Sequence, residues 1–252
     1  KPSGHDLLYN NSVIKPTRWG PPEQGWWLAA GGIEFGLPVE EHGYETALPW
    51  SHEIARAGDA VTAIVQDARE QGRLRARVEV TLRAGESRFT LRHQLTNGTE
   101  NRLEVKYWTN AMLAPGGGNR VSPGAQFILP ADQVVVHSTD DETLPGPGGI
   151  LSWPEWAGRD LSFPYHWRGW LGVFAWPRAA GSFAGVYDHL ADEGLARIFP
   201  PEIAAGVKGF GFGRPAHALP ADLWTDDGST YLELHGGLAP TFEDVHPLDA
   251  GE

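Results

Sequence analysis

The chain has 252 residues, a formal net charge of −12 and no cysteine. That length is compatible with a single all-β domain, while the negative charge argues against nucleic acid, which attracts clustered Lys and Arg. The chain lacks an apolar run of the ~18 residues that a membrane-spanning helix needs. We therefore expect neither nucleic-acid nor membrane partners. The lack of cysteine excludes disulfides, a thiolate nucleophile and Cys-ligated zinc, and it fits a cytoplasmic location while leaving export open.

Glycine and proline contribute 32 and 20 residues. This density leaves few windows for long helices and indicates many short strands joined by turns. The 11 tryptophans are a surplus: aromatic faces can stack on sugar rings, although most tryptophans in a globular protein fill the core. Because the chain opens at Lys1 without an initiator methionine or a signal peptide, we expect a segment upstream of it.

The first third of the chain contains strand candidates at residues 6–9 and 61–65, on either side of a segment rich in Gly and Glu. Residues 73–83 alternate apolar and polar side chains, a pattern typical of a half-buried antiparallel strand. A short turn containing glycine leads into a partner strand at residues 88–96. A hairpin is therefore predicted here.

Further strands are predicted at residues 103–113, 127–129, 134–137, 170–176, 183–187, 195–199 and 207–212. Residues 140–164 are rich in Gly, Pro, Ser and Trp, and we interpret them as a long excursion that could form a lid. About a dozen strands without a clear helix indicate an all-β fold, a large β-sandwich of antiparallel sheets in one domain over residues 1–252.

A late stretch, S-T-Y-L-E-L-H-G-G-L-A-P-T, alternates with the period of a strand. Tyr231, Glu233 and His235 then share one face, while Leu232 and Leu234 share the other. The leucine face belongs to the core. The opposite face is either an ordinary solvated surface or a surface that binds a ligand.

An early stretch, G-G-I-E-F-G-L-P-V-E-E-H-G-Y-E-T-A-L-P-W, gathers acidic, imidazole and indole side chains between glycines and prolines. It contains Glu34, Glu40, Glu41, His42 and Trp50. Our hypothesis is that the early and late stretches meet across a cleft of the size of a sugar.

Familiar catalytic motifs such as G-x-S-x-G or H-E-x-x-H are missing from the sequence. The adjacent pairs Glu41-His42 and Asp188-His189 cannot act as dyads within one strand, because neighbouring residues point to opposite faces. The partners of each histidine must therefore come from elsewhere in the fold. Several carboxylates with histidines could also hold a hard divalent cation such as calcium.

Five segments carry a resemblance to a known family. They are G-G-I-E-F-G-L-P, Y-W-T-N-A, G-V-Y-D-H, G-V-K-G-F-G-F-G and Y-L-E-L-H-G-G-L-A-P-T, in this order along nearly the whole chain. Together they resemble a bacterial domain-of-unknown-function branch of the galactose-mutarotase-like (aldose-epimerase-like) superfamily. The resemblance implies a β-supersandwich with a sugar in a concave sheet, here without the extreme N-terminal strands. The superfamily also hosts lyase, glycosidase and non-catalytic domains.

For the site, the resemblance implies a carboxylate base on a late strand, in a context similar to Leu232-Glu233-Leu234, and a histidine acid. The segment around His42 is similar to the histidine segment of the hexose-phosphate epimerases. Interconverting anomers requires removal of the C1 hydroxyl proton and protonation of the ring oxygen, so two groups of different pKa must flank the sugar. Glu233 is then the base and His42 the acid.

The resemblance is incomplete at two points. Where the galactose mutarotases carry Thr-Asn-His, this chain has Thr109-Asn110-Ala111, which weakens the case for simple mutarotation. Near His42 there is no obvious arginine cluster, so a phosphorylated substrate is not favoured. Glu34 offers a second carboxylate, which suits glycosidic bond chemistry or a plain salt bridge to a strand arginine.

The sequence therefore yields candidate residues for a site. The catalytic candidates are Glu233, His42 and Glu34, and the substrate-binding candidates are Trp50, Trp108, Asn110, Asp188, His189, Lys208 and His235. The first hypothesis is an aldose-epimerase-like isomerase that acts on a mono- or oligosaccharide without an organic cofactor or metal. A non-catalytic carbohydrate-binding domain and a lyase or glycosidase stay open, as do calcium and the oligomeric state.

Overall fold

A computed structural model describes residues 4–20, 25–39, 42, 49–67 and 72–252 of the chain. The chain divides into two compact units, which are treated separately. The smaller unit contains Glu45–Val105 and His246–Glu252, and the larger unit contains Ser3–Tyr44 and Lys106–Val245. Among the described residues, no helix has the length and apolar character needed to cross a membrane.

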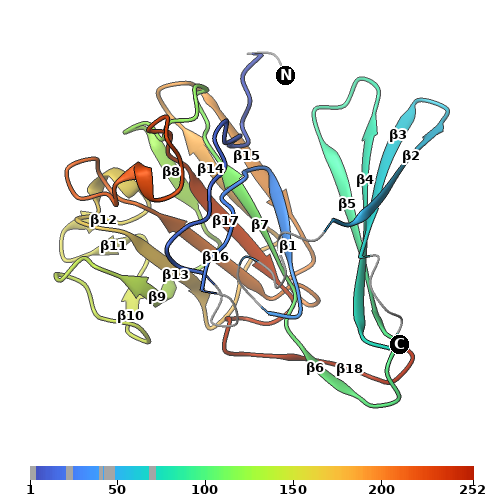
Figure 1. The fold of residues 1–252 in the computed structure, drawn as a ribbon. Coiled ribbons are helices and arrows are strands. Elements are labelled where there is room, and N and C mark those ends of the chain that lie inside the picture. Colours follow the sequence, from blue (N-terminus) through green and yellow to red (C-terminus); the bar gives the residue numbers. More distant parts are fainter. Residues whose placement is uncertain (1–3, 21–24, 40–41, 43–48, 68–71) are drawn as a thin grey trace. The chain divides into compact units, whose positions relative to one another are not determined.

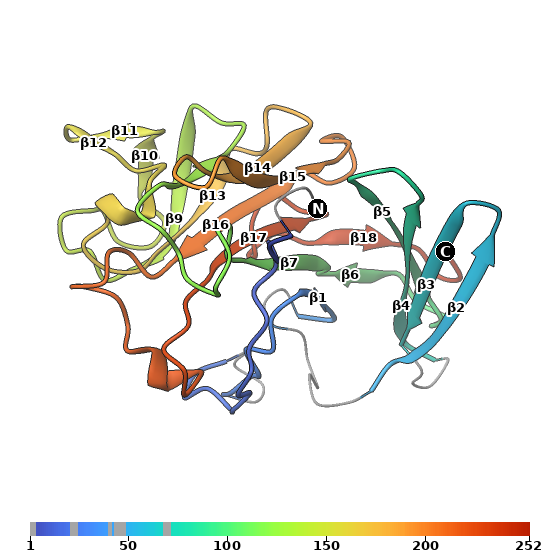
Figure 2. The ribbon, with the colours of Figure 1, turned by 90° about the horizontal axis from the view of Figure 1, so that it is seen from above.

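The larger unit is built on one extended sheet, called the large sheet below (Figures 1 and 2). In spatial order its described strands are β1 (Ile33–Gly36), β7 (Trp108–Leu113), β17 (Leu232–Gly237), β16 (Gly206–Gly211), β13 (Leu171–Trp176), β9 (Gln133–Thr139) and β10 (Ile150–Ser152). Each neighbouring pair is antiparallel. Strands far apart in sequence, such as β1, β7 and β17, are thereby placed side by side.

A second, shorter sheet completes the larger unit. It contains β15 (Glu193–Ile198), β14 (Phe183–Asp188) and β8 (Ala125–Ile128), and the smaller elements are β11 (Glu155–Trp156), β12 (Arg159–Asp160), η1 (Pro164–His166) and η2 (Ala221–Leu223). Phe127 and Val186 from the shorter sheet join Leu232 and Leu234 from the large sheet in one buried apolar cluster. The predicted sandwich of antiparallel sheets is therefore confirmed.

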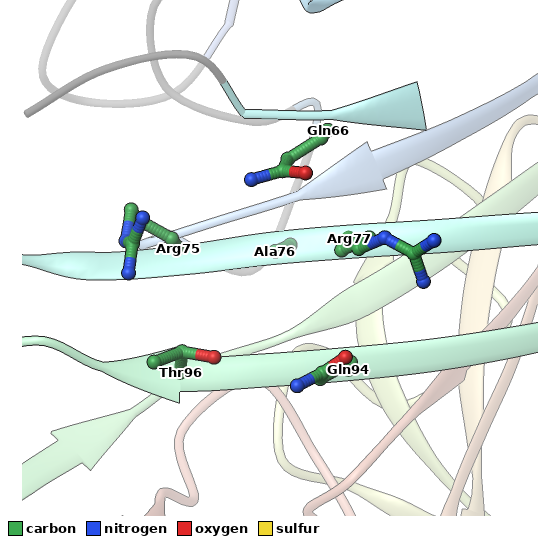
Figure 3. A pocket seen from close by; sticks show the side chains of 6 residues that line it. All are labelled: Gln66, Arg75, Ala76, Arg77, Gln94 and Thr96. Atoms are coloured by element: carbon green, nitrogen blue, oxygen red, sulfur yellow. The ribbon is translucent and has the colours of Figure 1, made fainter. Parts of the chain in front are cut away.

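The smaller unit contains a four-stranded antiparallel meander among its described residues. Its strands are β2 (Ser51–Ala57), β3 (Ala60–Gln66), β4 (Leu74–Arg83) and β5 (Phe89–Asn97), and β6 (Leu103–Val105) pairs with β18 (His246–Leu248). The alternating stretch 73–83 forms β4 as predicted. On the polar face of the meander lies an open depression of about 210 Å³, lined by Gln66, Arg75, Ala76, Arg77, Gln94 and Thr96 (Figure 3).

Two predictions about strands are wrong. The predicted strand 103–113 is broken after Val105, so that β6 belongs to the smaller unit and β7 to the larger one. The predicted strand 6–9 makes only isolated bridges, such as that between Leu8 and Leu113. Period-2 patterning predicts which face a residue occupies, but it does not reveal where a chain leaves one sheet for another.

The prediction of a lid at residues 140–164 is also wrong. The segment supplies β10, which pairs with β9 in the large sheet. Leu151, Trp153 and Leu161 from this segment are buried in the same cluster as Leu234, on the face of β17 opposite Glu233. The apolar residues of the excursion extend the core instead of covering a ligand site.

The buried carboxylate of Asp141 holds the segment 140–164 in place through hydrogen bonds. Asp141 has a fully buried side chain and accepts a hydrogen bond of 2.8 Å from Arg159 Nη1. The Thr143 hydroxyl and the backbone N–H of Arg168 also donate to it. Burial alone would raise the pKa of Asp141, but these hydrogen bonds lower it to about 2.

We expect Asp141→Asn to destabilise the fold by about 2 kcal/mol at pH 7, since one pKa unit corresponds to ~1.4 kcal/mol. The folded-state pKa lies below the unfolded value, so this stability is present above about pH 4 and is lost as the pH falls toward 2. Urea unfolding between pH 2 and pH 7 measures both effects. The exposed Asp249→Asn is the control, and equal midpoints for wild type and Asp141→Asn at pH 7 would refute the assignment.

Candidate functional site

The register of the large sheet places four polar side chains in one line. Glu34 on β1 lies opposite Asn110 on β7, which lies opposite His235 on β17, which lies opposite Lys208 on β16. Directly opposed residues share a face of a sheet, so these four residues form a polar row across the strands. At a strand spacing of ~4.8 Å the row extends about 14 Å.

The residues in the middle of the polar row are buried. Asn110 is 3%, His235 1% and Lys208 0% exposed. Buried polar side chains of this kind need partners on the same face. The contacts of the row therefore decide what the site can do.

The first contact is a carboxylate–imidazole pair within β17. Glu233 and His235 are two residues apart, so they point to the same face, as predicted, and His235 Nε2 donates to Glu233 Oε2 at 2.9 Å. Burial acts to raise the pKa of Glu233, but the hydrogen bond from His235 and the nearby His42 and Lys208 lower it overall. Glu233 is therefore a carboxylate at neutral pH.

The second pair joins the early stretch to the same face. His42 Nδ1 donates to Glu34 Oε1 at 2.9 Å, and the imidazole ring stacks on Trp27 with a centroid distance of 3.6 Å and an interplanar angle of 8°. His42 has a φ of 54°, in the left-handed region that costs a non-glycine residue roughly 1–2 kcal/mol. These two contacts hold the ring in place. Glu40 and Glu41 lie outside the described residues.

Asn110 lies between the two pairs. Its Nδ2 donates to Glu34 Oε1 at 3.4 Å, the oxygen that also accepts from His42. Glu34 and Glu233 therefore lie on one face of the large sheet with Asn110 and His235, and His42, the third catalytic candidate, reaches Glu34 on this face from outside the strands. The early and late stretches meet at this face.

An aromatic cluster closes one end of the row. Trp108, Phe174 and Phe242 pack edge to face, and Lys208 Nζ lies 4.3 Å from the centroid of the Phe242 ring. A cation over an aromatic face is stabilised electrostatically when it is removed from water. The cluster thus helps to hold a buried ammonium group close to Glu233.

Trp108 occupies space that two glycines leave open. A Cβ on Gly237 would lie 2.3 Å from the Trp108 ring, and a Cβ on Gly206 would also lie 2.3 Å from it. The indole therefore lies flat over backbone on the same face as the polar row. Any larger residue at these positions must displace it.

A second aromatic cluster borders the row further along the strands. It contains Tyr9, Trp27, Met112, Phe212, Trp224 and Tyr231 as buried members. Trp27 from this cluster stacks on His42. The polar row is thus a strip of ionisable groups between two apolar walls.

The remaining candidates are placed elsewhere. Asp188 and His189 belong to the shorter sheet and the turn after it; the Asp188 carboxylate accepts from Ser122 Oγ and the backbone N–H of Leu190, and His189 contacts Gln126. Trp50 lies in the smaller unit, directly before β2. Their roles in sugar binding stay predictions.

Some residues around the row were not predicted. His137 on β9 packs edge to face on Phe174 and Phe242, and the sequence V-V-V-H does not alternate, so it gives no signal for the face that His137 occupies. Trp27 gave no signal either, because its stacking on His42 depends on loop geometry. The described residues contain no group of three or more His, Cys, Asp or Glu arranged to hold a metal ion.

The model of DUF5107, a domain of unknown function, matches residues 1–247 of the chain. The chain belongs to the DUF5107 family. This agrees with the predicted branch of the galactose-mutarotase-like superfamily, whose fold the structure has. A search of curated proteins found no match for this DUF5107 domain.

Solved structures resemble the DUF5107 domain over most of its length. A TPR-domain containing protein from Parabacteroides distasonis matches 100% of the chain with a TM-score of 0.80 and 24% identity. The chain spans 40% of that protein. Slr1438 from Synechocystis resembles the chain with a TM-score of 0.60 and 13% identity. This match covers 88% of the chain and 74% of Slr1438.

A proposed aldose 1-epimerase from Klebsiella pneumoniae resembles the DUF5107 domain with a TM-score of 0.54 and 14% identity. The match covers 97% of this chain and 58% of that protein. At this level of identity the likeness concerns the fold alone. The fold is therefore one found among carbohydrate-related proteins, and the chemistry must be argued from the side chains.

We expect Gly237→Ala to destabilise the larger unit by about 1–3 kcal/mol, because the added methyl group collides with an indole that has no room to move. Urea unfolding of the variant measures the loss. Gly146→Ala is the matched control, since a Cβ there meets nothing within 4 Å. Equal unfolding midpoints for the two variants would show that Trp108 is not confined as described.

Proposed function

We propose that this DUF5107 domain binds a sugar on the polar face of the large sheet and interconverts its anomers by acid–base catalysis. The observation that supports this best is the position of Glu233 and His42. Glu233 lies on the polar face of the sheet, and His42, bonded to Glu34 on that face, is close enough to lower the pKa of Glu233. Glu233 has its own hydrogen-bonding partner in His235.

In the proposed reaction, the Glu233 carboxylate takes the proton of the C1 hydroxyl while His42 gives a proton to the ring oxygen. The bond between C1 and the ring oxygen breaks, and an open-chain aldehyde forms. After rotation about C1–C2, the hydroxyl attacks the other face of C1 and the two protons return. Both groups are regenerated, and no redox partner is required.

The neighbouring residues have supporting roles in this proposal. His235 and Lys208 keep Glu233 ionised, while Glu34 orients the His42 ring through Nδ1. Stacking on Trp27 fixes the plane of the same ring. A general acid held in this way is already oriented for proton transfer before the substrate arrives.

A hydrolase or lyase with Glu34 and Glu233 as paired catalytic carboxylates is less well supported. Glu34 Oε1 accepts hydrogen bonds from both His42 and Asn110. Through these bonds Glu34 positions two other side chains of the site, the imidazole of His42 and the amide of Asn110. The contacts of Glu34 suit an orienting group better.

We expect Glu233→Gln to lower the rate of anomer exchange by about 10²–10⁴-fold while leaving sugar affinity within a few-fold, because only the proton acceptor is lost. Exchange NMR on a panel of free aldoses measures the rate, and ligand-observed NMR measures the binding. Glu243→Gln, at an exposed glutamate of the same unit, is the control. The proposal fails if wild-type protein accelerates exchange of none of the sugars.

The lowered pKa of Glu233 predicts the acid limb of the pH profile. The base must be ionised, and its pKa lies below the ordinary value of 4.5. We therefore expect the midpoint of the acid limb of kcat/KM to lie below pH 4.5. Exchange rates from pH 3.5 to 7, corrected for spontaneous mutarotation, test this. An acid limb with its midpoint above pH 6 would exclude Glu233 as the titrating base.

A further inference from the structure

Asn110 carries an unused hydrogen-bond acceptor in the middle of the site. Asn110 is only 3% exposed. Within the part of the chain that the structure describes, its Oδ1 has no hydrogen-bond donor. A buried carbonyl oxygen without a donor is unfavourable by an amount comparable to a lost hydrogen bond.

The orientation of this amide is fixed by its neighbour. Glu34 Oε1 can only accept hydrogen bonds, and it lies 3.4 Å from Asn110 Nδ2. Rotating the amide by 180° would place Oδ1 against the carboxylate, so that two acceptors would face each other. The charge on Glu34 therefore directs Oδ1 away from Glu34.

The position of Asn110 in the row identifies what could donate to it. His235 lies directly opposite on β17 and Glu34 directly opposite on β1, while Glu233 is a diagonal neighbour two residues along β17. Diagonal neighbours across a sheet are ~7–8 Å apart, a gap that a small polar ligand can bridge. A ligand group that donates a hydrogen bond to Oδ1 thus lies between the two carboxylate–imidazole pairs.

We infer that Asn110 Oδ1 accepts a hydrogen bond from a hydroxyl of the bound sugar next to the anomeric centre, and that it selects sugars that carry this hydroxyl. The identity of the ligand as a sugar rests on the proposed function. A ring oxygen or an ether cannot replace the hydroxyl, because it has no proton to donate. A site built to bond a hydroxyl rejects the analogue that lacks it, because the buried acceptor is then left unpaired.

The test compares the affinity of each sugar with those of analogues that lack one hydroxyl at a time. For the wild-type protein we expect one position at which removal of the hydroxyl weakens binding by about tenfold to a hundredfold. In Asn110→Leu, which keeps the approximate size but has no acceptor, the parent sugar and that analogue should bind within about twofold. Titration calorimetry or ligand-observed NMR supplies the dissociation constants.

Asn110→Asp provides a second variant that keeps an acceptor oxygen. It loses the Nδ2 donor to Glu34, so overall affinity drops, but discrimination against the same analogue should persist. Asn101→Leu, which removes an exposed amide in the smaller unit, is the matched control and should behave like wild type. Thermal unfolding shows which variants are folded before binding is measured.

The outcomes separate this inference from the proposed function. Discrimination that survives unchanged in Asn110→Leu overturns the inference, as does a panel in which no sugar binds. If sugars bind with discrimination that depends on Asn110 but none is interconverted, the inference holds and the isomerase proposal fails. If sugars are interconverted with equal affinity for all analogues, the isomerase proposal holds and the inference fails.

Discussion

The antiparallel register between β7 and β17 is the constraint on which the site depends. It sets Asn110 opposite His235 and, through the flanking strands, brings Glu34 and Lys208 into the same row. A slip of one residue would turn every side chain of β17 to the other face. Glu233 and His235 would then enter the apolar cluster that Leu232 and Leu234 occupy. The leucines therefore specify the register, and the register assembles the site.

Keeping ionisable groups on this face is costly to the fold. The effective desolvation penalty of a buried ion is several kcal/mol, and well-packed apolar side chains are often as good or better for stability. The large sheet nevertheless buries Glu233, His235 and Lys208 between two aromatic clusters. Hydrogen bonds and the Phe242 ring compensate part of the penalty. Several buried ionisable side chains on one face, where apolar side chains would be expected, are typical of a functional site.

Much of this face could be predicted from local sequence, because strand period alone puts Glu233 beside His235 and away from the leucines. The alternation at 73–83 likewise specifies β4. Sheet order and register could not be predicted, since they depend on pairings between residues far apart in the sequence, such as Glu34 with Asn110 and Asn110 with His235. The break after Val105 and the burial of the 140–164 segment follow from competition between packing surfaces. The contact between Glu34 and His42 depends on a left-handed residue in a loop, which has no periodic signature.

The register also changes what the Thr109-Asn110-Ala111 segment means. The resemblance to the galactose mutarotases implies that they carry a histidine at the place of Ala111. In this chain Ala111 lies opposite Ile33 and Leu234 and packs against the apolar cluster, so its side chain faces the core. A histidine at position 111 would not reach the polar row. The residue of this segment that shares a face with Glu233 is Asn110, an amide that cannot transfer a proton at neutral pH. In the proposed reaction the proton donor is therefore His42, which Glu34 and Trp27 hold in place.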